Sequence, residues 1–202
     1  MFYSTRENDH GLPHNPFKAI VSPRPIAWVS TLNADGSANL APYSFFNGVN
    51  DSPPMVMFAS QTKKHGFETA KDSARNAAEQ GEFTVNIVGH TLKAEMNIST
   101  EHFDYGVDEF EKAGLTKRAG ETVKCPYVGE APAALECKTY KVVDLPGGNY
   151  EMIIGEVTGV HIRDEMLRDG RYDVTLARHV ARLGYRDYAQ IDDIFELARP
   201  DD

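Results

Sequence analysis

A chain of 202 residues with 41% hydrophobic and 25% charged side chains can bury a core without disulfides, and we interpret residues 1–202 as one domain. The formal net charge of −9 argues against non-specific nucleic-acid binding, although it leaves room for a local basic pocket. No apolar run reaches the roughly 18 residues of a membrane span and no signal-peptide core is present, so we expect no membrane association and a cytoplasmic location.

The chain begins with a polar lead-in and continues into a predicted β-hairpin. For residues 1–19 the sequence leaves open whether they lie across a neighbouring subunit or are loose. Residues 25–32 and 38–46 are strand-like, and Asp35-Gly36 is typical of the turn between them. The second strand carries small and hydroxyl residues and Pro42, where a purely structural hairpin favours bulky β-branched residues. These small residues indicate close approach of a flat ligand carrying a phosphate.

The next elements alternate between strands and helices. Residues 55–60 are predicted as a third strand that starts after two prolines, and residues 82–88 as a further strand, because apolar and polar side chains alternate there. A helix between them has Asp72 or Ser73 as its N-cap and Gly81 at its C-terminal end. Residues 90–99 are expected to form a short helix.

Residues 100–132 show no hydrophobic period, and we expect one helical turn near residues 108–113. Two interpretations stay open for this segment. It covers a bound ligand, in its own or a partner subunit, or it is a surface excursion with its aromatic side chains packed underneath. The ring-bearing residues concerned are His102, Phe103, Tyr105 and Phe110.

The C-terminal third contains the clearest hairpin, in which residues 134–145 and 150–163 flank a Pro-Gly-Gly-Asn turn and Gly155 marks a bulge. Another turn is predicted at residues 168–171, and a short helix at residues 191–197. Cys125 and Cys137 lack the spacing of a redox motif or zinc site, and we interpret them as reduced thiols. No metal site is predicted.

Several blocks of this sequence resemble, in order, the flavin reductase family with an FMN-binding split barrel. The blocks are SPRPIAWVSTLN, then G-x-x-NLAPYSFFN, then PPMVMFAS, then KDSARN before GEFTVNIV. They cover roughly residues 20–90, and ARLGYRDYA fits a later part of the pattern. The resemblance implies a mainly β fold with a few helices, specifically an FMN-binding split β-barrel of the Greek-key type.

The start of the predicted helix is the candidate phosphate site. Backbone N–H groups and the helix dipole favour an anion there, and Lys71, Asp72 and Ser73 add polar side chains. From the residues alone an ordinary capped helix is the commoner outcome, whereas the resemblance favours binding of the FMN phosphate.

The hairpin supplies the other candidates. Polar side chains on its facing strands could reach the pyrimidine edge of a flavin, or they could form a half-exposed polar face. The resemblance implies that FMN is held largely through backbone groups, with Arg24 assisting, at Ser30, Thr31, Asn39, Ala41, Pro42, Tyr43 and Ser44. It also implies that the ring rests near Phe58 and Ser60, although core packing is the commoner role of a strand phenylalanine or of Trp28.

The last block, RHVARLGYRDY, carries His179, Arg182 and Tyr188. The family has a related R-L-G-G segment near the flavin or the dimer interface, and here Tyr185 replaces the second glycine, which speaks against close backbone approach. We count Arg182 among the cofactor-binding candidates. His179 either donates to a reduced flavin or a nicotinamide carboxamide, or is an ordinary packing residue.

The resemblance implies a homodimeric FMN-dependent oxidoreductase that passes hydride from NAD(P)H to flavin and on to an acceptor or a partner oxygenase. No G-x-G-x-x-G motif follows a strand, so a nicotinamide would lie directly against the flavin. No catalytic side chain is assigned, because the cofactor supplies the chemistry. The alternatives are a flavin-binding or flavin-trafficking protein with little turnover, and a site for another flat ligand such as haem or pyridoxal phosphate.

Overall fold

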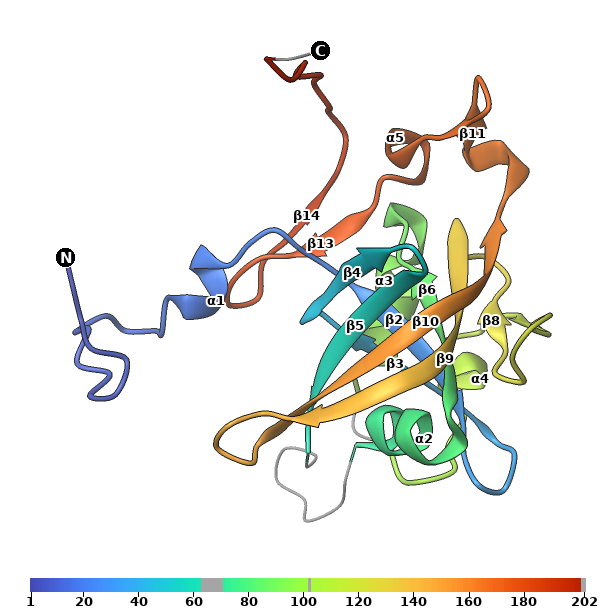
Figure 1. Cartoon of the computed structure of the whole chain (residues 1–202), viewed down its shortest axis with the longest axis horizontal. Coiled ribbons are helices and arrows are strands. Elements are labelled where there is room, and N and C mark those ends of the chain that lie inside the picture. The colour runs from blue at the N-terminus through green and yellow to red at the C-terminus, as the bar shows by residue number, and fades with distance from the viewer. Residues whose placement is uncertain (63–70, 102, 201–202) are drawn as a thin grey trace.

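The fold is described from a computed structural model, over residues 1–62, 71–101 and 103–200. A seven-stranded antiparallel sheet in the order β3-β2-β6-β9-β10-β5-β4 forms the body, and Figure 1 shows it curling so that β4 and β5 lie in front of β2 and β3. The mainly β prediction is confirmed. The strands are β2 (Ala27–Leu32), β3 (Ala38–Tyr43), β4 (Phe46–Asp51), β5 (Pro54–Gln61), β6 (Glu82–Ile87), β9 (Ala133–Asp144) and β10 (Tyr150–Ile162).

A second, three-stranded sheet joins the two ends of the chain. It pairs β1 (Arg24–Pro25) with β13 (Val180–Arg182) and β13 with β14 (Tyr188–Gln190). Two small hairpins are β7 (Lys117–Arg118) with β8 (Tyr127–Val128), and β11 (Leu167–Arg168) with β12 (Arg171–Tyr172).

The helices are short: α1 (Phe17–Ile20), α2 (Asp72–Gln80), η1 (His90–Leu92), α3 (Lys93–Ile98), α4 (Glu109–Lys112), η2 (Asp164–Met166) and α5 (Val174–Ala177). Within the ranges that the structure covers, none has the length and apolar character needed to cross a membrane.

Both predicted hairpins form. In the first, Ala27 pairs with Tyr43 and Leu32 with Ala38, but its second strand ends at Tyr43, and β4 starts a new strand at Phe46 that pairs with β5. The prediction of one strand over residues 38–46 was therefore wrong, because the chain bends at residues 44–45 to leave one edge of the sheet and join the other.

In the second hairpin the ladder between β9 and β10 shifts register at Gly155, as predicted. The position needs glycine, because a Cβ there would lie 2.5 Å from the ring of Phe83.

Helix α2 ends at Gly81 as predicted, with φ of 73° in the left-handed region. Its N-cap position is Lys71, however, and neither Asp72 nor Ser73 caps it. Ser73 Oγ instead donates to Asn39 Oδ1 at 2.9 Å, and the Asp72 carboxylate pairs with Arg75 at 2.7 Å. Ser73 and Asp72, which the local pattern assigns to capping, therefore bond to other side chains instead of to the backbone at the helix start.

Strand β2 is buried on both faces, between two apolar clusters. The cluster inside the curled sheet contains Phe58, Phe83 and Ile153, and α2 closes it with Ala74 and Ala77. The cluster outside the sheet packs Trp28, Leu40, Met96, Phe110 and Val128 between the sheet, α3 and α4. The central hairpin is thus the part of the fold around which both cores assemble.

The segment between α3 and β9 is fixed to the sheet by buried polar side chains. Val128 N donates to Asn86 Oδ1 at 2.7 Å, and Lys124 N donates to Glu82 Oε1 at 2.8 Å. The side chain of Phe110 is fully buried, which matches the interpretation of a packed excursion for this aromatic. His102 lies outside the described residues.

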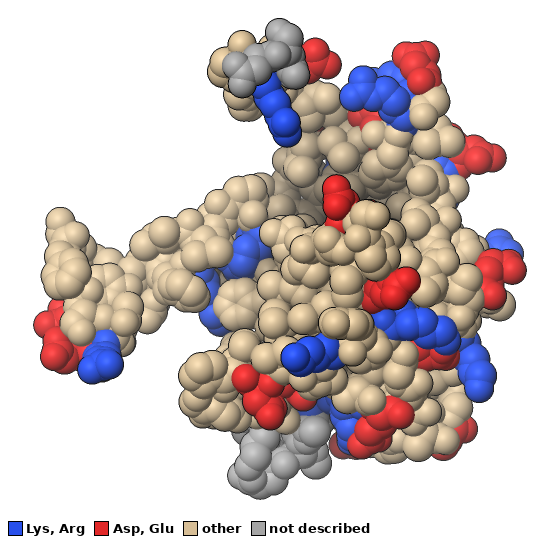
Figure 2. Space-filling view, viewed as in Figure 1, with Lys and Arg blue, Asp and Glu red and all other residues tan. Residues whose placement is uncertain are grey.

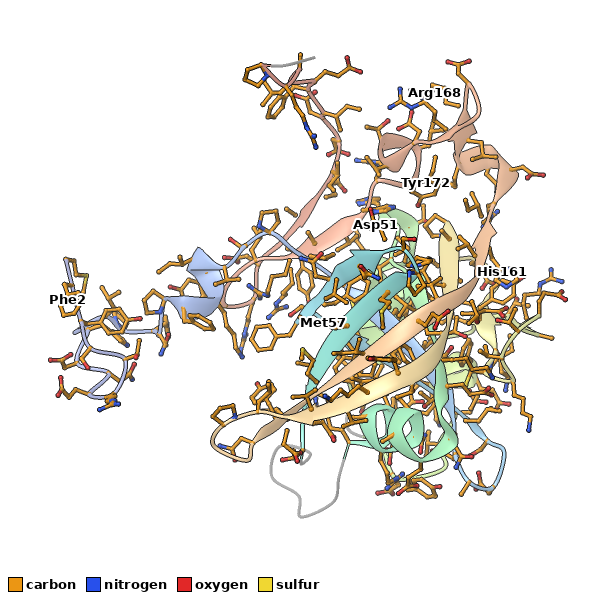
Figure 3. All side chains as sticks on the ribbon, viewed as in Figure 1. Phe2, Asp51, Met57, His161, Arg168 and Tyr172 are labelled. Atoms are coloured by element: carbon orange, nitrogen blue, oxygen red, sulfur yellow. The ribbon has the colours of Figure 1, made fainter. Side chains whose placement is uncertain are left out.

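Another of these anchors is Glu136, a buried carboxylate on β9. It accepts hydrogen bonds from the backbone N–H groups of Glu121 and Thr122, from the Thr122 hydroxyl and from His161 Nε2, at 2.5–2.7 Å. Burial raises the pKa of this carboxyl, but the hydrogen bonds from His161, Thr122 and the backbone outweigh burial and hold the pKa at about 2, below the ordinary 4.5. Figure 3 shows His161 on the opposite side of the molecule from Phe2, which lies near the N-terminus.

Glu136 therefore makes the protein sensitive to acid. A carboxyl whose pKa is lower in the folded state stabilises the fold above its unfolded pKa, and this stabilisation is lost as the pH falls from about 4.5 towards 2. Between pH 5 and pH 2 we expect the free energy of unfolding of Glu136→Gln to decrease by about 3 kcal/mol less than that of wild type. Urea denaturation at several pH values measures this. Glu156→Gln, an exposed site on β10, is the control and should keep the wild-type slope.

Both chain ends extend from the body, as Figure 1 shows for the arm that carries α1 and for the tail after β14. Residues 191–197 have no helical structure, so that prediction was wrong. The side chain of Phe195 is 84% exposed and that of Leu197 83%, and a short helix without a packing partner is not stable in water.

Candidate functional site

A cavity of about 790 Å³ lies where the N-terminal arm, residues 1–20, meets the body. This volume lies within the range of about 300–1,000 Å³ that is usual for small-molecule sites. Five parts of the chain line it. The arm contributes Pro13, His14, Asn15 and Lys18, and the region from β1 to the end of β3 contributes Arg24, Ile26, Pro42, Tyr43, Ser44 and Phe45. The remaining lining residues are Ala59, Ser60 and Gln61 of β5 with Lys71 and Tyr150; Met96 and Asn97 of α3 with Thr100; and Arg182, Leu183, Tyr185 and Tyr188 of the β13–β14 region.

The lining of this cavity is cationic although the chain is acidic. Lys18, Arg24, Lys71 and Arg182 line it, and the lining residues that the structure describes include no aspartate or glutamate. Figure 2 shows lysine and arginine side chains where the arm joins the body. In a chain of net charge −9 this local excess of positive charge favours an anionic ligand.

Arg24 fastens the arm and the small sheet to this cavity. Its Nη1 donates to the carbonyl oxygens of Lys18 and Val21, and its Nη2 donates to the carbonyl of Leu183 at 2.7 Å. Its Nε also donates to Ser44 Oγ, at the limiting distance of 3.5 Å. The side chain is only 6% exposed. Arg24 thus positions three segments that line the cavity.

Arg182 and the turn after it form another wall. Its guanidinium lies 4.4 Å from the ring centroid of Tyr188, and its Nη2 donates to the carbonyl of Tyr185. Burial lowers the pKa of Arg24, and the nearby charge of Arg182 lowers it further. Two cations this close together indicate a place where an anion would be stabilised.

This turn contains Tyr185 at the position of the second glycine in the family's R-L-G-G segment. Tyr185 adopts φ of 55°, a left-handed conformation that glycine adopts more readily, and its ring lies 5.6 Å from that of His14. Gly184 has no room for a side chain, because a Cβ would meet Ala19 at 2.4 Å. The extra ring therefore contacts the arm at the edge of the cavity.

Tyr43 lines the cavity, with its ring 5.0 Å from that of Phe58 and 5.5 Å from Lys71 Nζ. Burial raises the pKa of Tyr43 to about 12, so its hydroxyl stays protonated at neutral pH. It is therefore a hydrogen-bonding group and not a general base.

A second hollow of about 140 Å³ adjoins this point and shares Pro42, Tyr43 and Lys71 with the large cavity. Glu109 lies against it and accepts hydrogen bonds from Leu40 N at 2.8 Å and from Asn39 Nδ2 at 3.0 Å. Burial raises the pKa of Glu109, although these hydrogen bonds oppose the effect.

The candidate residues from the sequence fall into three groups. Those that line the large cavity are Arg24, Pro42, Tyr43, Ser44, Ser60, Lys71 and Arg182. Those that line only the small hollow are Asn39, Ala41, Asp72 and Ser73. Ser30, Thr31 and Phe58 line neither, and all three are buried in the sheet.

The third group has other contacts. The Ser30 hydroxyl donates to the carbonyl of Pro126, and Thr31 Oγ1 accepts from Asn76 Nδ2 at 3.0 Å. His179 also lies outside both hollows, with Nε2 2.6 Å from the Tyr172 hydroxyl, and burial lowers its pKa.

Sequence reasoning missed several lining residues. His14, Asn15 and Lys18 come from the arm, for which the sequence suggested no ligand contact, and Met96 and Asn97 come from α3. No local pattern marks these residues, because they reach the cavity only through the tertiary fold. In the parts of the chain that the structure describes, no group of three or more His, Cys, Asp or Glu side chains could hold a metal ion.

Comparison with known families defines the class. The model of the flavin reductase like domain matches residues 21–184, so the chain belongs to this family, and the split-barrel fold is confirmed. Similar proteins include uncharacterized ones from Aquifex aeolicus (strain VF5), 38% identical over 94% of this chain and 95% of that protein, and from Deinococcus radiodurans (strain R1), 41% identical over 90% and 82%.

Two solved structures are similar to this chain over almost its whole length. It is similar to nitrilotriacetate monooxygenase component B from Bacillus cereus, with TM-score 0.89 and 29% identity over 98% of each chain. It is also similar to 2-nitrobenzoate 2-nitroreductase NbaA from Pseudomonas fluorescens, with TM-score 0.85 and 30% identity over 99% of this chain and 96% of that chain. Family and neighbours together support a flavin-related oxidoreductase.

Proposed function

We propose that the protein is a cytoplasmic FMN-dependent oxidoreductase and that FMN binds in the large cavity. The observation that carries the proposal is the cationic lining, in which residues 1–62, 71–101 and 103–200 place no acidic side chain, in a chain of the flavin reductase like family. The phosphate would lie near Lys71 and the N-terminus of α2, where backbone N–H groups and the helix dipole favour an anion. The backbone of Pro42, Tyr43 and Ser44 would hold the ring.

Bound FMN would supply the electron transfer, accepting hydride from NAD(P)H and passing the electrons to an acceptor or a partner oxygenase. The protein's own groups then bind and orient. Tyr43 keeps its proton, Arg24 holds the arm against the small sheet, and the lysine and arginine side chains balance the anionic ligand. Similarity to a monooxygenase component B supports an oxygenase as the partner.

The test is reduction of bound flavin under anaerobic conditions. The purified protein, loaded with FMN, is mixed with NADH or NADPH in a stopped-flow instrument, and the flavin absorbance is followed. Rapid bleaching supports the oxidoreductase. Bound flavin that stays oxidised supports a flavin-binding or flavin-trafficking protein, and a haem or pyridoxal phosphate spectrum of the purified protein contradicts both.

A homodimer is part of the proposal. The arm and the tail extend from the body, and they carry exposed apolar side chains that include Phe17, Ile20 and Phe195. Extended segments of this kind are covered well by a second copy of the chain. Sedimentation velocity at micromolar concentration should show a dimer, and a monomer that still binds FMN would contradict this part.

A further inference from the structure

A further cavity of about 400 Å³ adjoins the proposed FMN site at α3. Its lining consists of His90, Lys93, Met96, Asn97, Val180, Tyr188, Ala189 and Gln190. Met96, Asn97 and Tyr188 also line the large cavity, so the two hollows meet at these residues. Apart from Tyr188, the sequence suggested no ligand contact for any of them. We call it the Lys93 cavity.

The Lys93 cavity combines an apolar floor with a cationic rim. Met96 and Val180 are buried beneath it. Lys93 Nζ lies 3.4 Å from His90 Nε2 on the rim, and the ring of Tyr188 forms the wall shared with the FMN site. A flat aromatic base and a phosphate fit such a combination, because aromatic and apolar side chains pack against the faces of the base and the lysine pairs with the phosphate charge.

The acidic group of Asp192 does not remove that preference. Asp192 lies two residues after Gln190 and interacts electrostatically with His90, but Arg178 Nε donates to its carboxylate at 2.7 Å and Gln190 Nε2 donates at 2.5 Å. Its charge is therefore paired with Arg178. Among the described residues, none that lines the Lys93 cavity is an aspartate or glutamate.

We propose that the Lys93 cavity binds the adenosine-phosphate half of the nicotinamide dinucleotide. This rests on the proposed function, in which the nicotinamide reaches flavin in the large cavity. A dinucleotide has a ring at each end and phosphates between them, so a ligand that starts beside the FMN site and passes Tyr188 brings its phosphates to Lys93 and His90. The subsite takes the place of the G-x-G-x-x-G motif that the sequence lacks.

Direct binding tests the assignment without turnover. Isothermal titration calorimetry measures 5′-AMP and 2′,5′-ADP binding to FMN-loaded wild type, Lys93→Glu and Lys112→Glu. Lys112 is an exposed lysine of α4 that lines neither cavity, so it controls for the change of net charge. We expect Lys93→Glu to lose at least roughly tenfold in affinity for one or both probes and Lys112→Glu to stay close to wild type. A larger loss for 2′,5′-ADP would assign the contact to the 2′-phosphate.

Wild type that binds neither probe, or Lys93→Glu that binds both normally, would overturn the assignment. Kinetics separate this from failure of the proposed function. Lys93→Glu should raise KM for the dinucleotide markedly more than KM for reduced nicotinamide mononucleotide, which lacks the adenosine half and one of the two phosphates. If wild type oxidises neither donor, the reductase activity is refuted, while calorimetry still decides whether the Lys93 cavity binds adenosine phosphates.

Discussion

Replacing Lys71 by glutamate is expected to weaken FMN binding by roughly ten- to a hundredfold and to leave riboflavin binding almost unchanged. Lys71 lies at the N-cap of α2, and it lines both the large cavity and the small hollow beside it. The substitution places a negative charge where we propose that the phosphate binds. Riboflavin has the same ring system without the phosphate, so its affinity reports on the ring pocket alone.

Quenching of flavin fluorescence measures both ligands on the same protein. Lys112→Glu makes the same change in net charge away from the cavity and should bind both ligands as wild type does. Equal losses for FMN and riboflavin in Lys71→Glu would remove Lys71 from the phosphate site. Repeating the titration at high salt should reduce the difference between FMN and riboflavin in wild type, because screening weakens a charge interaction.

Arg24→Ala is expected to have the largest effect on stability, lowering the free energy of unfolding by about 3 kcal/mol. The guanidinium donates to the carbonyls of Lys18, Val21 and Leu183, and alanine leaves these acceptors without it. FMN affinity should fall as well, since the arm and the β13–β14 turn both line the cavity.

Urea denaturation and FMN titration measure the two effects. Arg24→Lys keeps the positive charge but cannot donate in three directions from one planar group, so we expect it to recover only part of the stability. Arg171→Ala, at an exposed position in β12, is the matched control and should change stability by less than about 0.5 kcal/mol. Full stability in Arg24→Lys would show that charge, not the hydrogen-bond geometry, is what matters at this position.

The strands were predictable where local pattern and turn chemistry agree. The turn at residues 33–37 and the break at residues 146–149 mark both hairpins, and Gly81 marks the end of α2. The burial of β2 was not predictable in the same way. Ser30 and Thr31 resemble a half-exposed polar face in the sequence, but structure from elsewhere in the chain covers each side of the strand, and both hydroxyls find partners there.

The residues of the candidate site were predictable only where they carry a local sequence signal. Lys71 and the small residues of β3 carry local signals, namely a helix start and a strand poor in bulky side chains, and they line the hollows. His14 and Lys18 carry no such signal. They reach the cavity through the tertiary fold, in which Arg24 of β1 bonds the carbonyl of Lys18 while β1 pairs with β13, and no local pattern specifies contacts between residues so far apart in the chain.

This pairing has a consequence for the order of events during synthesis. Arg24 lies opposite Arg182 in the small sheet, and the wall of the cavity ends with Tyr188. A chain still attached to the ribosome has made almost the whole seven-stranded sheet before it has made the residues that complete the cavity. Flavin would therefore be acquired only by released or nearly finished chains, and a product truncated before β13 would keep the strands of the barrel but lack a complete pocket.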